Sequence, residues 1–151
     1  MWRTFGLILW LLAAPGAAVA QGPAVAIHGN WCGPNFGAGP ILDALDAACF
    51  RHDMCVAQLG AFNCGCDLAF MGELRSRPWP GPALAEKARA VYEAIAMTPC
   101  ADPAGYQRKL SLAAADWAAG VVSGREPPTA VLDRLGRLMA EAMLRGGYRG
   151  Y

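Results

Sequence analysis

The first strongly periodic stretch of the chain places apolar, cysteine and histidine side chains at helical spacing. They recur every three or four residues, at Leu45, Cys49, His52, Cys55 or Val56, and Leu59. This is the period of one helix face. Pro40 suits the first turn of a helix and Gly60 suits its end. The pattern therefore predicts a helix over 40–59, with His52 on its inward face and Asp53 about 100° around the helix from it.

Farther along the chain, the same periodicity predicts helices over 83–97, 105–121 and 129–145. A proline-rich connector at 78–82 and a loop at 123–128 separate them. The last helix carries a stripe of apolar residues, made up of Val131, Leu132, Leu135, Leu138, Met139 and Ala142. We expect this stripe to pack on the protein core, with docking on lipid as the alternative.

The first twenty residues show the three parts of a secretory signal peptide. Met1–Arg3 is a short positive start, Phe5–Ala14 is an apolar run, and Ala18–Ala20 is a small-x-small cleavage site. The run is shorter than the ~18–20 apolar residues that cross a bilayer. We therefore expect cleavage after Ala20, a secreted or periplasmic protein, and no transmembrane segment.

Removal of the signal leaves residues 21–151, the length of one domain. We expect distinctive motifs at 28–72, a helical part at 83–145 and a flexible tail at 146–151. Arg3 leaves with the signal, so twelve basic residues face twelve acidic ones. This balance lacks the basic face that a nucleic-acid partner requires, so we expect none. The oligomeric state is open, and a monomer is the simplest expectation.

All six cysteines fall in the mature part, at Cys32, Cys49, Cys55, Cys64, Cys66 and Cys100. An even number in an exported domain indicates three disulfides. Zinc binding is the alternative, because a Cys-x-Cys motif and two histidines offer ligands. However, the usual pairs of Cys-x2-4-Cys motifs are missing and export favours oxidation, so we favour disulfides with the pairing left open.

The ten residues at 31–40 combine three glycines with prolines and an asparagine. Such a loop disfavours regular structure, but its backbone carbonyls can fold inward around a hard cation. Asp53 would add a carboxylate to that oxygen shell. An ordinary tight connector is the alternative for the loop. For His52, the alternative is a hydrogen-bonded core residue, the commoner role of a histidine on an apolar face.

Taken together, three motifs resemble secreted phospholipase A2, in a short bacterial-like or divergent form. The glycine-rich loop and the following helix resemble that family's calcium loop and active-site helix, through Cys32-Gly33 and Pro40-x-x-Asp43-x-Leu45-Asp46-x-x-Cys49-x-x-His52-Asp53-x-Cys55. Cys64-Gly65-Cys66-Asp67 resembles the start of its second long helix. The resemblance implies an all-α, disulfide-bonded fold with two long antiparallel helices, a calcium-binding loop and additional C-terminal helices.

The resemblance also implies a role for each matching residue. His52 matches the general base that takes a proton from the attacking water, and Asp67 matches the dyad partner that orients its ring. Asp53 matches the side-chain ligand of calcium. The backbone ligands of calcium match the carbonyls of Trp31, Gly33 and Asn35. The Gly33 N–H matches a donor to the oxyanion.

The implied activity is calcium-dependent hydrolysis of the sn-2 acyl ester of glycerophospholipids at a membrane or micelle surface, releasing fatty acid and lysophospholipid. An imidazole with an ordinary pKa of ~6.5 can accept a proton at neutral pH. A carboxylate on its far nitrogen selects the tautomer, and calcium stabilises the oxyanion. A catalytically silent lipid- or protein-binding module on the same scaffold is the alternative.

The family's cysteine pattern pairs Cys32 with Cys49 and Cys55 with Cys66. If these two pairs are taken from the family, Cys64 and Cys100 are left to form the third disulfide.

The chain departs from the family next to the dyad. Val56 replaces a tyrosine that commonly hydrogen-bonds the dyad aspartate. We therefore expect Asp67 to rely on water, Tyr92 or Tyr106. Residues 21–27 are too short for an N-terminal docking helix, and His28 is expected to be a loop residue without a role.

Overall fold

A computed structural model describes residues 24–146, which contain five α-helices. In chain order they are α1 (Ala44–Leu59), α2 (Cys64–Ser76), α3 (Pro82–Met97), α4 (Pro103–Val122) and α5 (Ala130–Gly146). The all-helical, disulfide-bonded class expected from the sequence is confirmed. The predicted signal peptide at 1–20 lies outside the described residues. So does the predicted tail, apart from Gly146 at the end of α5.

The start of α1 differs from the sequence prediction by four residues. The helix was expected from Pro40, but it begins at Ala44 because Asp43 caps it. Asp43 Oδ1 accepts hydrogen bonds from the backbone N–H groups of Leu45 and Asp46, both at 2.9 Å. This side chain satisfies donors that have no partner within the helix. The predicted end is confirmed, since Gly60 follows the last helical residue with φ 97°.

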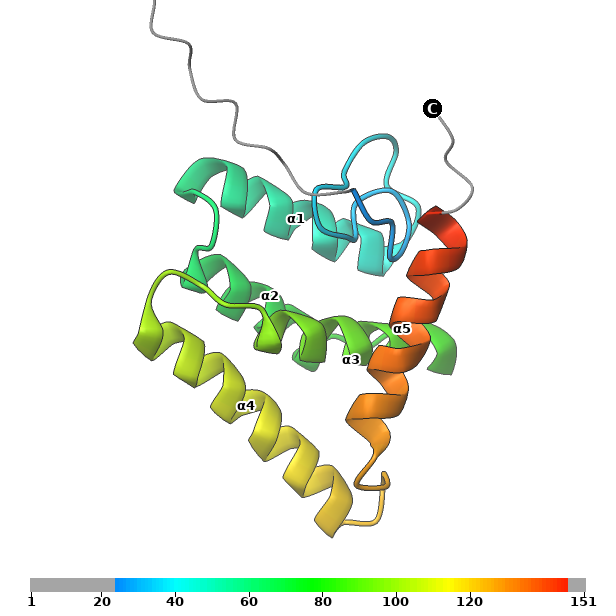
Figure 1. The fold of residues 1–151 in the computed structure, drawn as a ribbon. Coiled ribbons are helices and arrows are strands. Elements are labelled where there is room, and N and C mark those ends of the chain that lie inside the picture. Colours follow the sequence, from blue (N-terminus) through cyan, green and yellow to red (C-terminus); the bar gives the residue numbers. More distant parts are fainter. Residues whose placement is uncertain (1–23, 147–151) are drawn as a thin grey trace, which may run out of the picture.

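Helices α1 and α2 run antiparallel and pack side by side (Figure 1). Their contacts show the direction: moving back along α1 from Cys55 through His52 to Arg51, the partners advance along α2, namely Cys66, Asp67 and Glu73. The Cys55–Cys66 disulfide joins the two helices near the turn between them, with Cα atoms 5.7 Å apart. The two antiparallel helices expected from the resemblance are therefore present.

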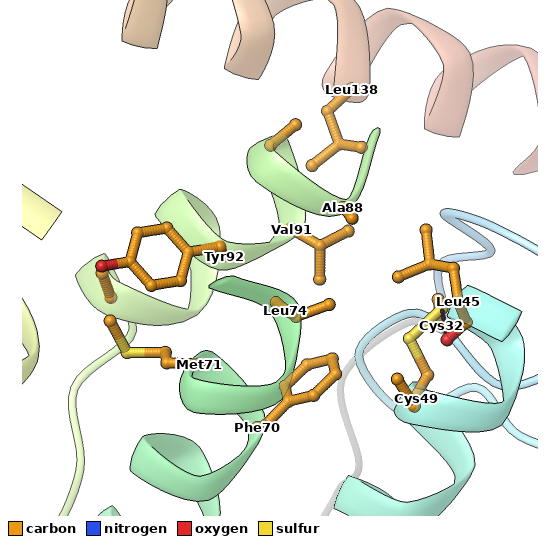
Figure 2. Packing of buried hydrophobic residues seen from close by; sticks show 13 residues of the cluster. Cys32, Leu45, Cys49, Phe70, Met71, Leu74, Ala88, Val91, Tyr92 and Leu138 are labelled. Carbon is orange, nitrogen blue, oxygen red and sulfur yellow. Dashed lines mark hydrogen bonds between the residues drawn. A yellow bond between two sulfur atoms is a disulfide. The ribbon is translucent and has the colours of Figure 1, made fainter. Parts of the chain in front are cut away.

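Helix α3 lies at the centre of the C-terminal part and packs against α2, α4 and α5 (Figure 1). The apolar core is formed mainly where α1, α2 and α3 meet. In Figure 2, Leu74 and Phe70 of α2 lie below Val91 of α3, with the Cys32–Cys49 disulfide to their right. Within the described residues, no helix is both long and apolar enough to span a membrane.

Helix α5 confirms only part of its predicted packing stripe. Leu138 and Ala142 are buried, whereas Leu132 and Met139 are 73% and 57% exposed. A buried ion pair also holds this helix, since the Arg134 guanidinium contacts Glu93 of α3 with Nε 2.9 Å from Oε2. The inward face of α5 thus combines apolar side chains with a buried arginine.

We predict that Asp43→Ala lowers the free energy of unfolding by about 1 kcal/mol near neutral pH, because α1 loses its N-cap. Burial favours a higher pKa for Asp43, but the Asp46 N–H and the His28 side chain outweigh it and lower the pKa. The ionised carboxylate therefore stabilises the fold above its unfolded pKa, and this contribution is lost as the pH falls through the lower folded pKa.

Urea unfolding of the wild-type and Asp43→Ala chains at neutral pH and at about pH 2 to 3 measures this effect. The difference in stability should shrink in acid. An equal difference at both pH values would show that the Asp43 carboxylate does not act through its charge.

Candidate active site

His52 of α1 and Asp67 of α2 face each other across the two antiparallel helices. His52 Nε2 lies 2.9 Å from Asp67 Oδ1, within hydrogen-bonding distance. The Cys55–Cys66 disulfide lies one residue before Asp67 on α2 and one turn after His52 on α1. The structure therefore brings together the two residues that the sequence predicts to form a dyad. The disulfide links the two helices close to these residues.

The imidazole of His52 is held in one orientation. Its ring stacks on Phe70 of α2, with centroids 4.7 Å apart and planes 21° from parallel. Its Nδ1 faces Asp53 Oδ1 at 3.8 Å, a contact between charges that is too long for a hydrogen bond. The side chain is 15% exposed. One ring nitrogen is thus bound to Asp67, and the other is directed to the side where Asp53 lies.

The protein groups around His52 favour its protonated form. Burial works against the charge, but the carboxylates of Asp53 and Asp67 outweigh it and raise the pKa of His52 to about 9. For Asp67, burial favours a higher pKa, whereas hydrogen bonds from His52 and Lys109 bring it below its ordinary value. From the sequence, the pKa of His52 was expected to be the ordinary ~6.5. In the structure it is higher, because two carboxylates stabilise the imidazolium.

The glycine-rich loop folds back on the segment that precedes it. The Ile27 N–H donates to the Cys32 carbonyl at 2.8 Å, and the Val25 N–H donates to the Pro34 carbonyl at 3.1 Å. Gly33 has φ 148°, and a Cβ there would lie 1.8 Å from the Val25 carbonyl oxygen, so only glycine fits. The predicted Cys32–Cys49 disulfide is confirmed and ties this loop to α1.

Asp53 lies against this loop. A Cβ placed on Gly37 would be 3.1 Å from Asp53 Oδ2 and 2.9 Å from the Trp31 ring, so both side chains reach the loop backbone there. The Trp31 indole N–H closes the loop by donating to the Gly39 carbonyl at 3.0 Å. A carboxylate beside a loop rich in backbone oxygens matches the donor chemistry that calcium prefers.

The backbone positions expected to bind calcium lie in the same loop. The Gly33 carbonyl accepts a long, 3.3 Å hydrogen bond from the Phe36 N–H, which leaves one of its lone pairs for a cation. Asn35 is exposed and has φ 53°, a left-handed conformation that asparagine tolerates. In the part of the chain that the structure describes, no group of three His, Cys, Asp or Glu side chains is suited to hold a metal ion, so a calcium site here would depend on backbone carbonyls beside Asp53.

Asp46 anchors the loop, a role that the sequence analysis did not assign. This fully buried side chain accepts hydrogen bonds from the backbone N–H groups of Asn30 and Trp31 at 2.9 and 2.7 Å, and from that of Leu42 at 2.9 Å. The loop is therefore held by a carboxylate at the start of α1 as well as by a disulfide. In the sequence, the position of Asp46 directly after the apolar Leu45 was the one sign that this carboxylate is buried.

Lys109 of α4 is the second residue missed by the sequence analysis. Its ammonium group is fully buried and donates to Asp67 Oδ2 and, at 2.6 Å, to the Thr98 carbonyl. The expectation that Tyr92 or Tyr106 supports Asp67 is wrong. The Tyr92 hydroxyl donates to Asp116 at 2.6 Å, and the Tyr106 hydroxyl donates to the Met97 carbonyl at 3.1 Å.

The third predicted disulfide, Cys64–Cys100, is also present and joins α2 to the segment before α4. This link brings the N-terminal turn of α4 close to α2, in the region where Lys109 reaches Asp67. The two pairings implied by the resemblance and the third, which remained after them, are thus all present.

His28 is not the inert loop residue that the sequence suggested. Its Nε2 lies 2.6 Å from Asp43 Oδ2, so it connects the loop to the cap of α1. These two residues also line a cavity of about 540 Å³ between the start of α1, α3 and α5. None of the predicted site residues lines that cavity. The candidate site around His52 is therefore a separate part of the surface.

We predict that Asp46→Ala lowers the free energy of unfolding by about 2–4 kcal/mol, because three backbone N–H groups lose a charged acceptor. Hydrogen exchange of the Asn30 and Trp31 amides measures the local effect, and both should exchange faster. Asp46→Asn is the matched control, since its remaining oxygen can still accept these two hydrogen bonds. Unchanged exchange in Asp46→Ala would contradict the anchoring role.

Comparison with known proteins assigns no family to this chain. No protein-family model, curated protein or solved structure matches it. The resemblance to secreted phospholipase A2 therefore remains an expectation carried by motif spacing, and the functional conclusion depends on the contacts described above.

Proposed function

We propose that this protein is a calcium-dependent esterase that hydrolyses the sn-2 acyl ester of glycerophospholipids. The observation that carries the proposal is the hydrogen bond between His52 and Asp67, with the Asp53 carboxylate on the other side of the imidazole and against a glycine-rich loop. This arrangement combines a general base, its orienting partner and a cation ligand.

In the proposed reaction, His52 activates water. Its Nε2–H donates to Asp67 Oδ1, which leaves the Nδ1 lone pair to accept the proton of a water that attacks the ester carbonyl. Asp67 then stabilises the imidazolium that forms, and stacking on Phe70 keeps the ring in place. His52 then returns the proton to the leaving alkoxide. No covalent intermediate with the protein is required.

The residues proposed to hold calcium are Asp53 and the loop carbonyls of Trp31, Gly33 and Asn35. Bound calcium would stabilise the oxyanion and offset the attraction of Asp53 for the His52 proton. The Gly33 N–H is proposed as a further donor to the oxyanion. Asp46 would keep these loop positions in register with α1 through its bonds to Asn30 and Trp31.

Exposed apolar side chains support a lipid as the substrate. Leu59 and Phe62, at the turn between α1 and α2, are 64% and 65% exposed, and Met54, next to Asp53, is also exposed. We propose that these three side chains belong to a lipid-facing surface, since a contiguous exposed apolar patch marks a membrane or partner contact. A site next to such residues suits an insoluble, acyl-chain substrate.

The contacts of His52 also suit the alternative, a catalytically silent lipid- or protein-binding module. The carboxylates of Asp53 and Asp67 raise the pKa of His52 above its ordinary value against the effect of burial. In such a module His52 would serve as a half-buried cation between two carboxylates. The activity measurement below separates the two functions.

We predict that the oxidised chain from residue 21 onward releases fatty acid from phospholipid vesicles in the presence of calcium and stops when a chelator is added. His52→Gln should lower kcat by about 100-fold or more, because the general base is lost. His28→Gln, which alters the other histidine of the chain, is the matched control and should retain turnover. Fatty-acid release from sn-2-labelled lipid provides the measurement.

Asp53→Lys separates the cation site from the fold. It should abolish turnover while the helicity and the three disulfides remain, whereas Gln58→Lys, at an exposed position of the same helix, should remain active. Equal turnover with and without chelator would remove calcium from the mechanism. Binding to vesicles without turnover of any glycerophospholipid would favour the binding module.

A further inference from the structure

The side chain of Lys109 is completely buried, and its ammonium group forms two hydrogen bonds and lies 5.9 Å from the centroid of the Tyr106 ring. It donates to Asp67 Oδ2 of α2 and, at 2.6 Å, to the carbonyl of Thr98 at the end of α3. Removing an ammonium group from water costs several kcal/mol unless its protons are bound. The position of Lys109 on α4 therefore depends on a carboxylate that also takes part in the candidate site.

The two oxygens of Asp67 are divided between two partners. Oδ1 receives the hydrogen bond of His52, and Oδ2 receives that of Lys109. A carboxylate bound at one oxygen only can rotate about its terminal bond, whereas contacts from two sides fix its plane. The Asp67 carboxylate is thus held from two sides, by His52 at one oxygen and by Lys109 at the other.

We propose that Lys109 is a positioning residue that holds the Asp67 carboxylate in the orientation needed to bind His52. The inference rests on the proposed function, because it describes the support of the same dyad. From the sequence this support was expected from water, Tyr92 or Tyr106, since Val56 has no hydrogen-bond donor in its side chain. The structure supplies the donor from α4, since Lys109 lies 42 positions after Asp67 in the chain.

The alternative is a purely structural role, in which Lys109 only fastens α4 to the rest of the fold. A second polar contact allows the two roles to be separated. The Tyr92 hydroxyl of α3 donates to Asp116 of α4 at 2.6 Å, so it also fastens α4, but it does not touch Asp67. Loss of this contact should weaken the packing of α4 and leave the dyad in place.

The test compares Lys109→Met with Tyr92→Phe in the oxidised chain from residue 21 onward. On sn-2-labelled phosphatidylglycerol vesicles with calcium, Lys109→Met should lower kcat about 10- to 100-fold with KM within about twofold, because a misplaced catalytic group slows chemistry rather than binding. Tyr92→Phe should be less stable than wild type but keep its kcat. Equal kcat losses in both variants, or a folded Lys109→Met with wild-type kcat, would overturn the proposal.

A double-mutant comparison covers the case in which Lys109→Met fails to fold. Asp67→Asn removes the charge of the carboxylate, and Lys109→Met in the same chain also removes the buried charge of the ammonium group. If Lys109 acts through Asp67, this second change should alter the remaining kcat by less than about twofold. A further tenfold loss would mean that Lys109 acts by another route.

Nuclear magnetic resonance gives a readout that does not require turnover. The Hε2 proton of His52 should give a slowly exchanging signal in the wild type, be broadened in Lys109→Met and be retained in Tyr92→Phe. A wild-type chain without turnover would defeat the proposed function, yet this signal would still decide the positioning role. An unchanged Hε2 signal in Lys109→Met would overturn the inference about Lys109.

Discussion

The carboxylate of Asp67 is the point at which three helices are joined. It lies on α2, accepts a hydrogen bond from His52 of α1 and forms an ion pair with Lys109 of α4. A buried charge with partners on two sides is stable, whereas removal of either partner leaves an uncompensated charge. The candidate chemistry and the packing of α4 therefore depend on the same side chain.

Disulfides and polar contacts share the task of holding this small fold. The apolar core is concentrated between α1, α2 and α3, and its inner residues include several alanines. Outside it, α4 and α5 are fastened by the Tyr92 hydroxyl and the Arg134 guanidinium. Cross-links reduce the freedom of the unfolded chain, which matters most where the apolar core is limited. The loop and the two helices of the site are therefore held by these bonds together with the apolar contacts between α1 and α2.

Much of the helical framework could be predicted from local pattern. Periodicity placed α3 and α5 within about one residue at each end, because those helices have clear apolar faces. The start of α1 was wrong because a side-chain cap at Asp43 outweighed the general preference of proline for a first turn. The cysteine pairing came from the family resemblance, since six cysteines alone allow many connectivities.

The missed residues share one property: their partners lie far away in the sequence. Lys109 and Asp67 are 42 positions apart, and Asp46 bonds backbone groups 15 and 16 positions before it. A local pattern marks each of them only as a polar residue next to apolar ones. The raised pKa of His52 has a different origin, because one of its two carboxylates, Asp53, is the next residue in the sequence and the other, Asp67, was already expected as its partner.

The central claim is that His52 is fixed by Asp67 so that Nδ1 is available to accept a proton. The tautomer of the neutral His52 ring, determined from long-range proton–nitrogen correlation spectra of the oxidised chain, tests it most directly. We expect the neutral ring to carry its proton on Nε2 and none on Nδ1. A neutral ring with its proton on Nδ1, or one that exchanges freely between the two forms, would contradict it.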